Sequence, residues 1–273
     1  MKKILFACCL AIVSSAHAQQ HTIEKIWETD SVIAIPESVL PDAGSGILYV
    51  SLIDGGAWSP DGKGGVGKLS VDGKLNDTSW IRGLHAPKGM GIYGNRLYVA
   101  DITEVVVIDI KKGSVEKKIV IDSAQALNDI TIDSKGIVYV SDSRGGTVYR
   151  IKNDVAMLYL QDLKGINGLK AIGKDLFILS GKNFVKADKR KTITKVADLQ
   201  QGGDGIEPVG NGDFIVTSWS GYMYYVTADG TTEVLLDTHL DKVNAADIGY
   251  DASKRIIYVP TFNAKTVAAY RLK

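Results

Sequence analysis

The sequence lacks the residues that would support a disulfide-stabilised or zinc-binding protein. Its two cysteines, Cys8 and Cys9, both lie in the first ten residues, and the three histidines after residue 18 do not stand in paired ligand spacing. Zinc sites of the usual Cys and His type are therefore excluded beyond the N-terminal segment. A chain of 273 residues without disulfides must draw its stability from a large core.

The sequence also lacks an excess of charge and, after its first residues, a long apolar run. Its 32 Lys and Arg nearly balance its 31 Asp and Glu, which argues against nucleic acid or an anionic membrane as the main partner. The apolar run Ile4 to Val13 is too short to span a bilayer. It follows Lys2-Lys3 and precedes Ala16-His17-Ala18, the pattern of a cleaved secretory leader. We therefore expect a signal peptide at residues 1–18, a single domain at residues 19–273, and a periplasmic or secreted protein.

Helical periodicity and the common catalytic loops are missing as well. No sustained apolar spacing of 3.6 residues appears, and no G-x-S-x-G elbow supports serine hydrolase chemistry. The glycine-rich segment at 202–205 is followed by no Lys-Ser/Thr pair, so it is not a phosphate-binding loop.

The sequence instead contains a repeated β-hairpin. Residues 127–142, LNDITIDSKGIVYVSD, combine an alternating apolar run, a turn at Ser134-Lys135-Gly136 and a β-branched run. Degenerate copies recur about every 40 residues, centred on Tyr49, Tyr98, Tyr139, Phe177, Ile215 and Tyr258. Six such repeats predict an all-β, six-bladed β-propeller with four-stranded blades. For the third blade the predicted strands are 130–133, 137–141, 147–152 and 155–160.

The last repeat is short of one outer strand. Thr266 to Leu272 can form its third strand, after which the chain ends. Ile23 to Glu28 has the composition of a strand, and we predict that it closes the ring beside Val267 to Leu272. Closure would leave no long unpaired edge at that seam.

One residue before each innermost strand occupies an equivalent position in the repeats. These residues are Glu37, Lys88, Asn128, Asn167, Asp204 and Ala246. Innermost strands of a propeller surround one channel, so we expect these side chains to converge at one mouth of it. Two carboxylates and two amides suit a hard divalent cation, Ca²⁺ before Mg²⁺. The same groups would equally serve to cap strand ends and line a wet channel.

Four of these positions also carry short motifs: PESV at Glu37, LNDI at Asn128, INGL at Asn167 and GDGI at Asp204. They resemble the motifs of the senescence marker protein/gluconolactonase (regucalcin-like) family. The resemblance implies a six-bladed propeller and metal-dependent hydrolysis of sugar lactones and related esters. It implies that Glu37, Asn167 and Asp204 bind the metal and that Asn128 holds the substrate. Asp204, or water beside it, would act as the catalytic base.

Lys88 departs from this resemblance, because the family position is usually small or uncharged. An ammonium beside a divalent cation is unfavourable. Either Lys88 points aside and binds an anionic group of the substrate, or it replaces the metal by pairing with Glu37 and Asp204. The first interpretation predicts an exported hydrolase acting on a small molecule. The second predicts an exported, non-catalytic propeller that binds a small ligand or a protein.

Connections after the second strands should open at the same mouth. The segment Asp54 to Gly67 is long and rich in glycine, and it is either a functional lid or a tolerated insertion. Trp58, Trp219 and Phe262 lie in such connections and would either stack on a substrate or pack between blades. The basic run Lys186 to Lys195 is expected to form a solvated outer hairpin.

Overall fold

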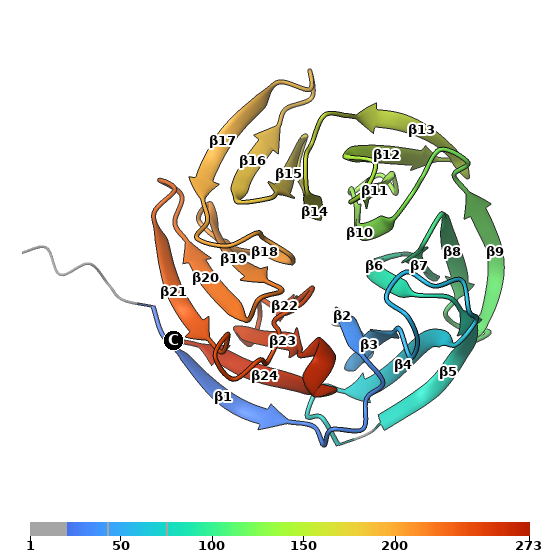
Figure 1. Cartoon of the computed structure of the whole chain (residues 1–273), viewed down its shortest axis with the longest axis horizontal. Helices are drawn as coiled ribbons and strands as arrows, with labels where there is room; N and C mark the ends of the chain where they lie inside the picture. The colour runs from blue at the N-terminus through green and yellow to red at the C-terminus, as the bar shows by residue number, and fades with distance from the viewer. Residues whose placement is uncertain (1–20, 43, 75) are drawn as a thin grey trace, which may run out of the picture.

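The computed structural model describes residues 21–42, 44–74 and 76–273. They form six sheets of four antiparallel strands arranged in a ring about a central axis (Figure 1). This confirms the predicted all-β, six-bladed propeller. The expected leader at residues 1–18 lies outside the described residues. In the described part of the chain no helix is long and apolar enough to cross a membrane.

Each blade runs from an innermost strand at the channel to an outermost strand at the rim. The first three blades contain β2 (Pro36–Asp42), β3 (Ile47–Leu52), β4 (Gly64–Ser70), β5 (Asn76–Leu84); β6 (Pro87–Tyr93), β7 (Arg96–Asp101), β8 (Glu104–Asp109), β9 (Ser114–Val120); and β10 (Leu127–Ile132), β11 (Val138–Asp142), β12 (Thr147–Lys152), β13 (Val155–Leu160). The others contain β14 (Ile166–Ile172), β15 (Asp175–Ser180), β16 (Asn183–Ala187), β17 (Ile193–Asp198); β18 (Ile206–Gly210), β19 (Asp213–Ser218), β20 (Tyr222–Val226), β21 (Thr232–Asp237); and β22 (Gly249–Asp251), β23 (Ile256–Pro260), β24 (Val267–Leu272), β1 (Ile23–Glu28). A short 3₁₀ helix, η1 (Phe262–Ala264), follows β23.

The N-terminal strand closes the ring as predicted. Strand β1 pairs antiparallel with β24 and forms the outermost strand of the sixth blade (Figure 1). Ile23 lies opposite Leu272, and Glu28 lies opposite Ala268. The seam therefore joins the two ends of the described chain by backbone hydrogen bonds.

The hydrophobic core is distributed between the blades. Each of six clusters of buried side chains combines residues from two neighbouring blades. Between the second and third blades, for example, Val105 and Val107 of β8 share a cluster with Val138 and Val140 of β11. Because apolar burial is the main stabilising term in folding, contact between blades holds the ring together.

Four innermost strands contain a β-bulge at the same place. The ladder shifts between Pro36 and Val39, Pro87 and Met90, Leu127 and Ile130, and Ile166 and Leu169. The two residues inside each bulge are the repeated polar position and its successor. The sequence-based prediction placed Asn128-Asp129 before the first strand of its blade. The structure differs, because Leu127 still pairs with Asp142 and β10 continues through the bulge.

Glycine follows the polar position in three blades, and close approach of neighbouring strands explains it. A Cβ on Gly89 would lie 2.6 Å from Cα of Asp129, on the adjacent innermost strand. A Cβ on Gly205 would lie 2.6 Å from the backbone nitrogen of Ile248. Only glycine permits backbones this close.

Candidate functional site

The repeated polar positions lie at the end of the channel where the innermost strands begin. Bulges hold Glu37, Lys88, Asn128 and Asn167, and bulges characteristically re-aim side chains. Asp204 precedes β18 and is fixed by its backbone N–H, which donates to the carbonyl of Thr217 at 2.7 Å. Glu37 is 4% exposed, and Lys88 and Asp204 are each 3% exposed. The site is therefore built from buried charges.

Glu37 and Asp204 are both buried carboxyl groups with raised pKa values. Burial raises the pKa of Asp204 to about 7, although the hydrogen bond from Asn167 and the charge of Lys88 act to lower it. Burial also raises the pKa of Glu37 well above its ordinary value, opposed by Lys88 and reinforced by Asp204 and Asp247. Oε2 of Glu37 is enclosed and has no hydrogen-bond partner. Such a pair favours a proton or a cation near neutral pH.

Lys88 lies beside this pair, but its ammonium points to backbone oxygens. Nζ donates to the carbonyl of Ala57 at 2.8 Å and to that of Ala86 at 3.3 Å. It also lies 4.4 Å from the centre of the Trp58 ring. Burial lowers the pKa of Lys88, and the charges of Glu37, Asp101 and Asp204 partly offset this. Within the described residues, no ion pair closer than 4.0 Å joins Lys88 to a carboxylate.

The two asparagines are held by different partners. Asn167 Nδ2 donates to Oδ1 of Asp204 at 2.7 Å, which ties β14 to the segment before β18. Asn128 Nδ2 donates to the hydroxyl of Ser143 at 3.0 Å, and Ser143 in turn donates to the carbonyl of Ile166 at 2.7 Å. Asn167 therefore belongs with Asp204, while the Asn128 amide is held by Ser143 of its own blade, which is itself bonded to the neighbouring blade.

A second polar layer lies three residues further along the innermost strands, and the sequence analysis missed it. Lys170 and Glu207 occupy this position in the fourth and fifth blades and form an ion pair at 2.6 Å. Although burial disfavours the ammonium, Glu207 and then Asp129 and Asp247 raise the pKa of Lys170. Lys170 follows Asn167 by three positions and Glu207 follows Asp204 by three, and this equal spacing in the sequence could have revealed the layer. This layer places further charge beneath the candidate site.

Asp247 connects the two layers at the sixth blade. Its carboxylate accepts a hydrogen bond from Ser38 Oγ at 2.6 Å, and its backbone N–H donates to the carbonyl of Glu37 at 3.0 Å. Burial raises the pKa of Asp247 to about 7, and the charges of Asp204 and Glu207 add to the effect. Ala246, the aligned residue, contributes no polar side chain, so its successor supplies the carboxylate there.

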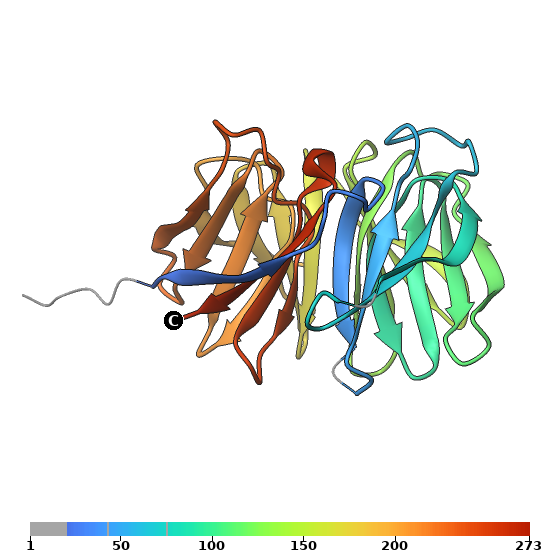
Figure 2. The same cartoon turned by 90° about the horizontal axis from the view of Figure 1, so that it is seen from below.

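The glycine-rich connection lies over Lys88. It comprises residues 53–63, because β4 already begins at Gly64, so the connection ends four residues before its predicted end at Gly67. The backbone N–H of Gly62 donates to Nδ1 of His85 at 3.2 Å, and Ala57 accepts from Lys88. In the side view this connection and η1 lie on the same face of the disc (Figure 2). The expected common mouth is therefore present.

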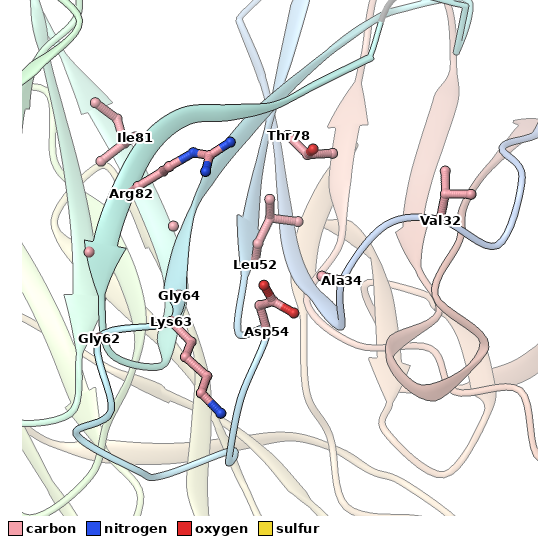
Figure 3. Close-up of a pocket in the computed structure, with 12 residues that line it drawn as sticks. Val32, Ala34, Leu52, Asp54, Gly62, Lys63, Gly64, Thr78, Ile81 and Arg82 are labelled. Carbon is pink, nitrogen blue, oxygen red and sulfur yellow. The ribbon is translucent and has the colours of Figure 1, made fainter.

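The flank of this connection forms a pocket of about 320 Å³. Figure 3 shows Asp54 and Lys63 on the connection and Ile81 and Arg82 on β5 around it. Further round the mouth, Trp219 and Phe262 pack edge to face with ring centres 5.5 Å apart, and Trp219 is 47% exposed. Trp219 thus packs on Phe262 and still exposes part of its ring to solvent.

The donor set at the mouth is made of oxygen atoms from few carboxylates. Among the described residues no group of three or more His, Cys, Asp or Glu side chains is placed to hold a metal. The mouth offers two carboxylates and an amide instead, a mixed oxygen set of the kind that Ca²⁺ accepts. The unpartnered Oε2 of Glu37 fits this use. Asn167 currently turns Nδ2 toward Asp204, so its amide must reverse to offer oxygen on that side.

Comparison with known proteins supports the architecture. No family model and no curated protein matches the chain. A solved structure of catalytically inactive virginiamycin B lyase from Staphylococcus aureus, with quinupristin, is 13% identical, has a TM-score of 0.66, and covers 93% of this chain and 100% of its own. A streptogramin B lyase structure is 11% identical, has a TM-score of 0.68, and covers 93% of this chain and 98% of its own. At these identities the similarity shows the propeller fold alone. Membership of the senescence marker protein/gluconolactonase family is not shown, and the residue roles it implies stay predictions.

Proposed function

We propose that this chain is an exported, metal-dependent hydrolase of sugar lactones or related esters, acting on a small molecule at the channel mouth. The observation that carries the proposal is the enclosed Oε2 of Glu37, which has no partner although Asp204 lies in the same buried group of charges. An unpaired buried carboxylate oxygen costs free energy unless a ligand satisfies it. A divalent cation, Ca²⁺ before Mg²⁺, is the ligand that the oxygen donors suit.

Each residue has a distinct role in this proposal. Glu37, Asn167 and Asp204 would hold the cation, which when bound supplies polarisation of the substrate carbonyl. Asp204 is the candidate base, because a carboxylate beside the attacked carbon can accept the proton of a water. Asn128, fixed through Ser143, would orient the substrate. Lys88 would attract an anionic group on it.

A second candidate function is supported by the same lysine. If Lys88 compensates the carboxylates electrostatically, the protein is a non-catalytic propeller that binds a small ligand or a protein. The mutual influence of Lys88 with Glu37 and Asp204 favours this alternative. The hydrogen bonds from Nζ to Ala57 and Ala86 argue against it, because they direct the ammonium away from a bridging position.

Calorimetric titration of the purified chain with Ca²⁺ tests the proposal. We expect the wild type to bind saturably and the Asp204→Ala variant to lose binding while staying folded, as judged by a single cooperative thermal transition. Glu207→Gln is the matched control, since it removes one carboxylate from the channel one layer below the mouth. It should retain Ca²⁺ binding.

Three outcomes separate the candidates. Loss in Asp204→Ala with retention in Glu207→Gln supports a metal site at the mouth. Equal affinity in the wild type and Asp204→Ala removes the assigned site. Absence of binding in the wild type, together with its appearance in Lys88→Met, supports the non-catalytic alternative.

A further inference from the structure

The face opposite the channel mouth carries a pocket between the third and fourth blades. Its volume is about 320 Å³. Tyr139 of β11, Arg150 of β12 and Tyr159 of β13 line it from one blade, and Ala171 and Leu176 line it from the other. The turns after β10, β14 and β16 form its rim. The pocket is thus separate from the residues of the mouth.

Arg150 is the central cation of this pocket and lacks a partner for part of its guanidinium. Its Nε is enclosed and makes no hydrogen bond. The guanidinium carbon lies 5.9 Å from the centre of the Tyr159 ring, and Tyr139 and Tyr159 meet edge to face at 5.1 Å. An enclosed N–H donor without an acceptor is costly, so the group is prepared for an acceptor from a ligand.

Four lysines surround Arg150 at the rim. Lys135, Lys174, Lys189 and Lys191 all line the pocket and are exposed, and Nζ of Lys191 lies 4.9 Å from the centre of the Tyr159 ring. In the described part of the chain none of the four, nor Arg150, forms an ion pair. Two belong to the basic run that the sequence analysis expected to be solvated.

The acidic residues of the pocket are already engaged. Oδ1 of Asp133 accepts from the backbone N–H groups of Lys135 and Ile137, and Asp175 lies 3.6 Å from Nζ of Lys186. Five cations therefore face two carboxylates. Other basic groups at blade turns are balanced: Arg96 pairs with Glu116 at 2.6 Å, and Lys254 pairs with Asp251 at 3.4 Å.

We propose that this pocket binds the phosphate group of a small phosphorylated molecule, with the rest of that molecule lying against the tyrosine rings. The guanidinium fork matches the spacing of phosphate oxygens, and the flexible lysines add point charges. A dianion neutralises the excess positive charge better than a single carboxylate does. The volume is at the lower end of the range of about 300 to 1,000 Å³ for small-molecule sites, so the ligand is small.

Titration calorimetry in calcium-free buffer tests this, with inorganic phosphate and phenyl phosphate as probes. We expect one site for each, with phenyl phosphate binding more tightly because of the tyrosine walls. Arg150→Gln should weaken both probes by about tenfold or more, because it removes charge-assisted hydrogen bonds. Lys254→Gln removes a cation from the turn between β22 and β23, which corresponds in the sixth blade to the turn of Lys135, and as the control it should leave affinity unchanged.

Several results of this titration would contradict the proposed phosphate site. Absence of saturable binding by both probes overturns the proposal, as does equal weakening in Arg150→Gln and Lys254→Gln. Equal affinity for the two probes overturns the role of the tyrosines. If Arg150→Gln fails to fold, as judged by its thermal transition, the exposed pair Lys189→Gln and Lys191→Gln replaces it. That double variant should weaken phenyl phosphate by roughly tenfold, and unchanged affinity there overturns the proposal.

Discussion

Replacing Asp204 by Asn should stabilise the metal-free protein at alkaline pH while removing its proposed function. The folded-state pKa of Asp204 is raised from 3.8 to about 7, chiefly by burial. Between those values the folded state binds more protons than the unfolded state, so stability falls as pH rises from about 4 to about 7. The resulting loss of unfolding free energy is still present at pH 8. The side chain in the Asp204→Asn variant carries no charge, so this variant should be free of that loss.

The magnitude follows from the pKa difference. At about 1.36 kcal/mol per unit, a pKa raised from 3.8 to about 7 corresponds to about 4 kcal/mol. This is an upper value, because the charge of Asp204 also raises the pKa of Glu37, so that the cost of ionisation is shared between the two carboxyl groups. Asparagine keeps an oxygen that can accept the 2.7 Å hydrogen bond from Asn167. We therefore expect a gain of roughly 2 to 4 kcal/mol at pH 8 and almost none at pH 4.

Urea unfolding with EDTA present, at pH 4, 6 and 8, measures this gain. Asp251→Asn is the control of opposite sign. Burial acts to raise the pKa of Asp251, but hydrogen bonds from Ser253 and Lys254 lower it overall. Its contribution to stability is present at high pH and lost on acidification, so the control should lose stability at pH 8. A gain for Asp204→Asn that is independent of pH, or a loss at pH 8, would refute the reasoning.

Three further predictions concern the mouth and the seam. Lys88→Met should retain Ca²⁺ binding and raise KM for lactones with an anionic group, as measured by initial rates; Ca²⁺ binding that appears only in this variant would contradict it. Asn128→Ala should lower kcat/KM for lactone hydrolysis by about tenfold through loss of a substrate hydrogen bond, with Ca²⁺ affinity unchanged by calorimetry; loss of that affinity would place Asn128 at the metal. Deleting residues 21–28 removes β1 and leaves the edge of β24 open, so the melting temperature should fall and light scattering should show self-association. An unaltered transition would refute that role of the seam.

Much of the fold could be predicted because the repeat is local. The strands Thr147–Lys152 and Val155–Leu160 have the bounds that alternation and the Asn153-Asp154 turn indicated. Closure by Ile23–Glu28 followed from counting strands. The bulges could not be predicted, because they are a property of the pairing register and not of one strand's composition. For that reason the sequence analysis placed Asn128 before the strand, whereas it lies inside β10.

The candidate site was predictable in position and less so in its contacts. Alignment of the repeats places Glu37, Lys88 and Asp204 at equivalent positions, and the structure buries all three there. The acceptors of Lys88 are backbone carbonyls in a distant connection and just before its own strand, and carbonyls leave no signature in sequence. The same alignment, extended by three residues, would also have predicted the Lys170–Glu207 pair.

The most direct test of the central claim is lactone hydrolysis by the wild-type chain as a function of Ca²⁺. Activity on a panel of sugar lactones is measured after chelation with EDTA and again after Ca²⁺ is restored. The account predicts that hydrolysis disappears on chelation and returns with Ca²⁺. Hydrolysis that is indifferent to chelation, or absent at saturating Ca²⁺ across the panel, would contradict it.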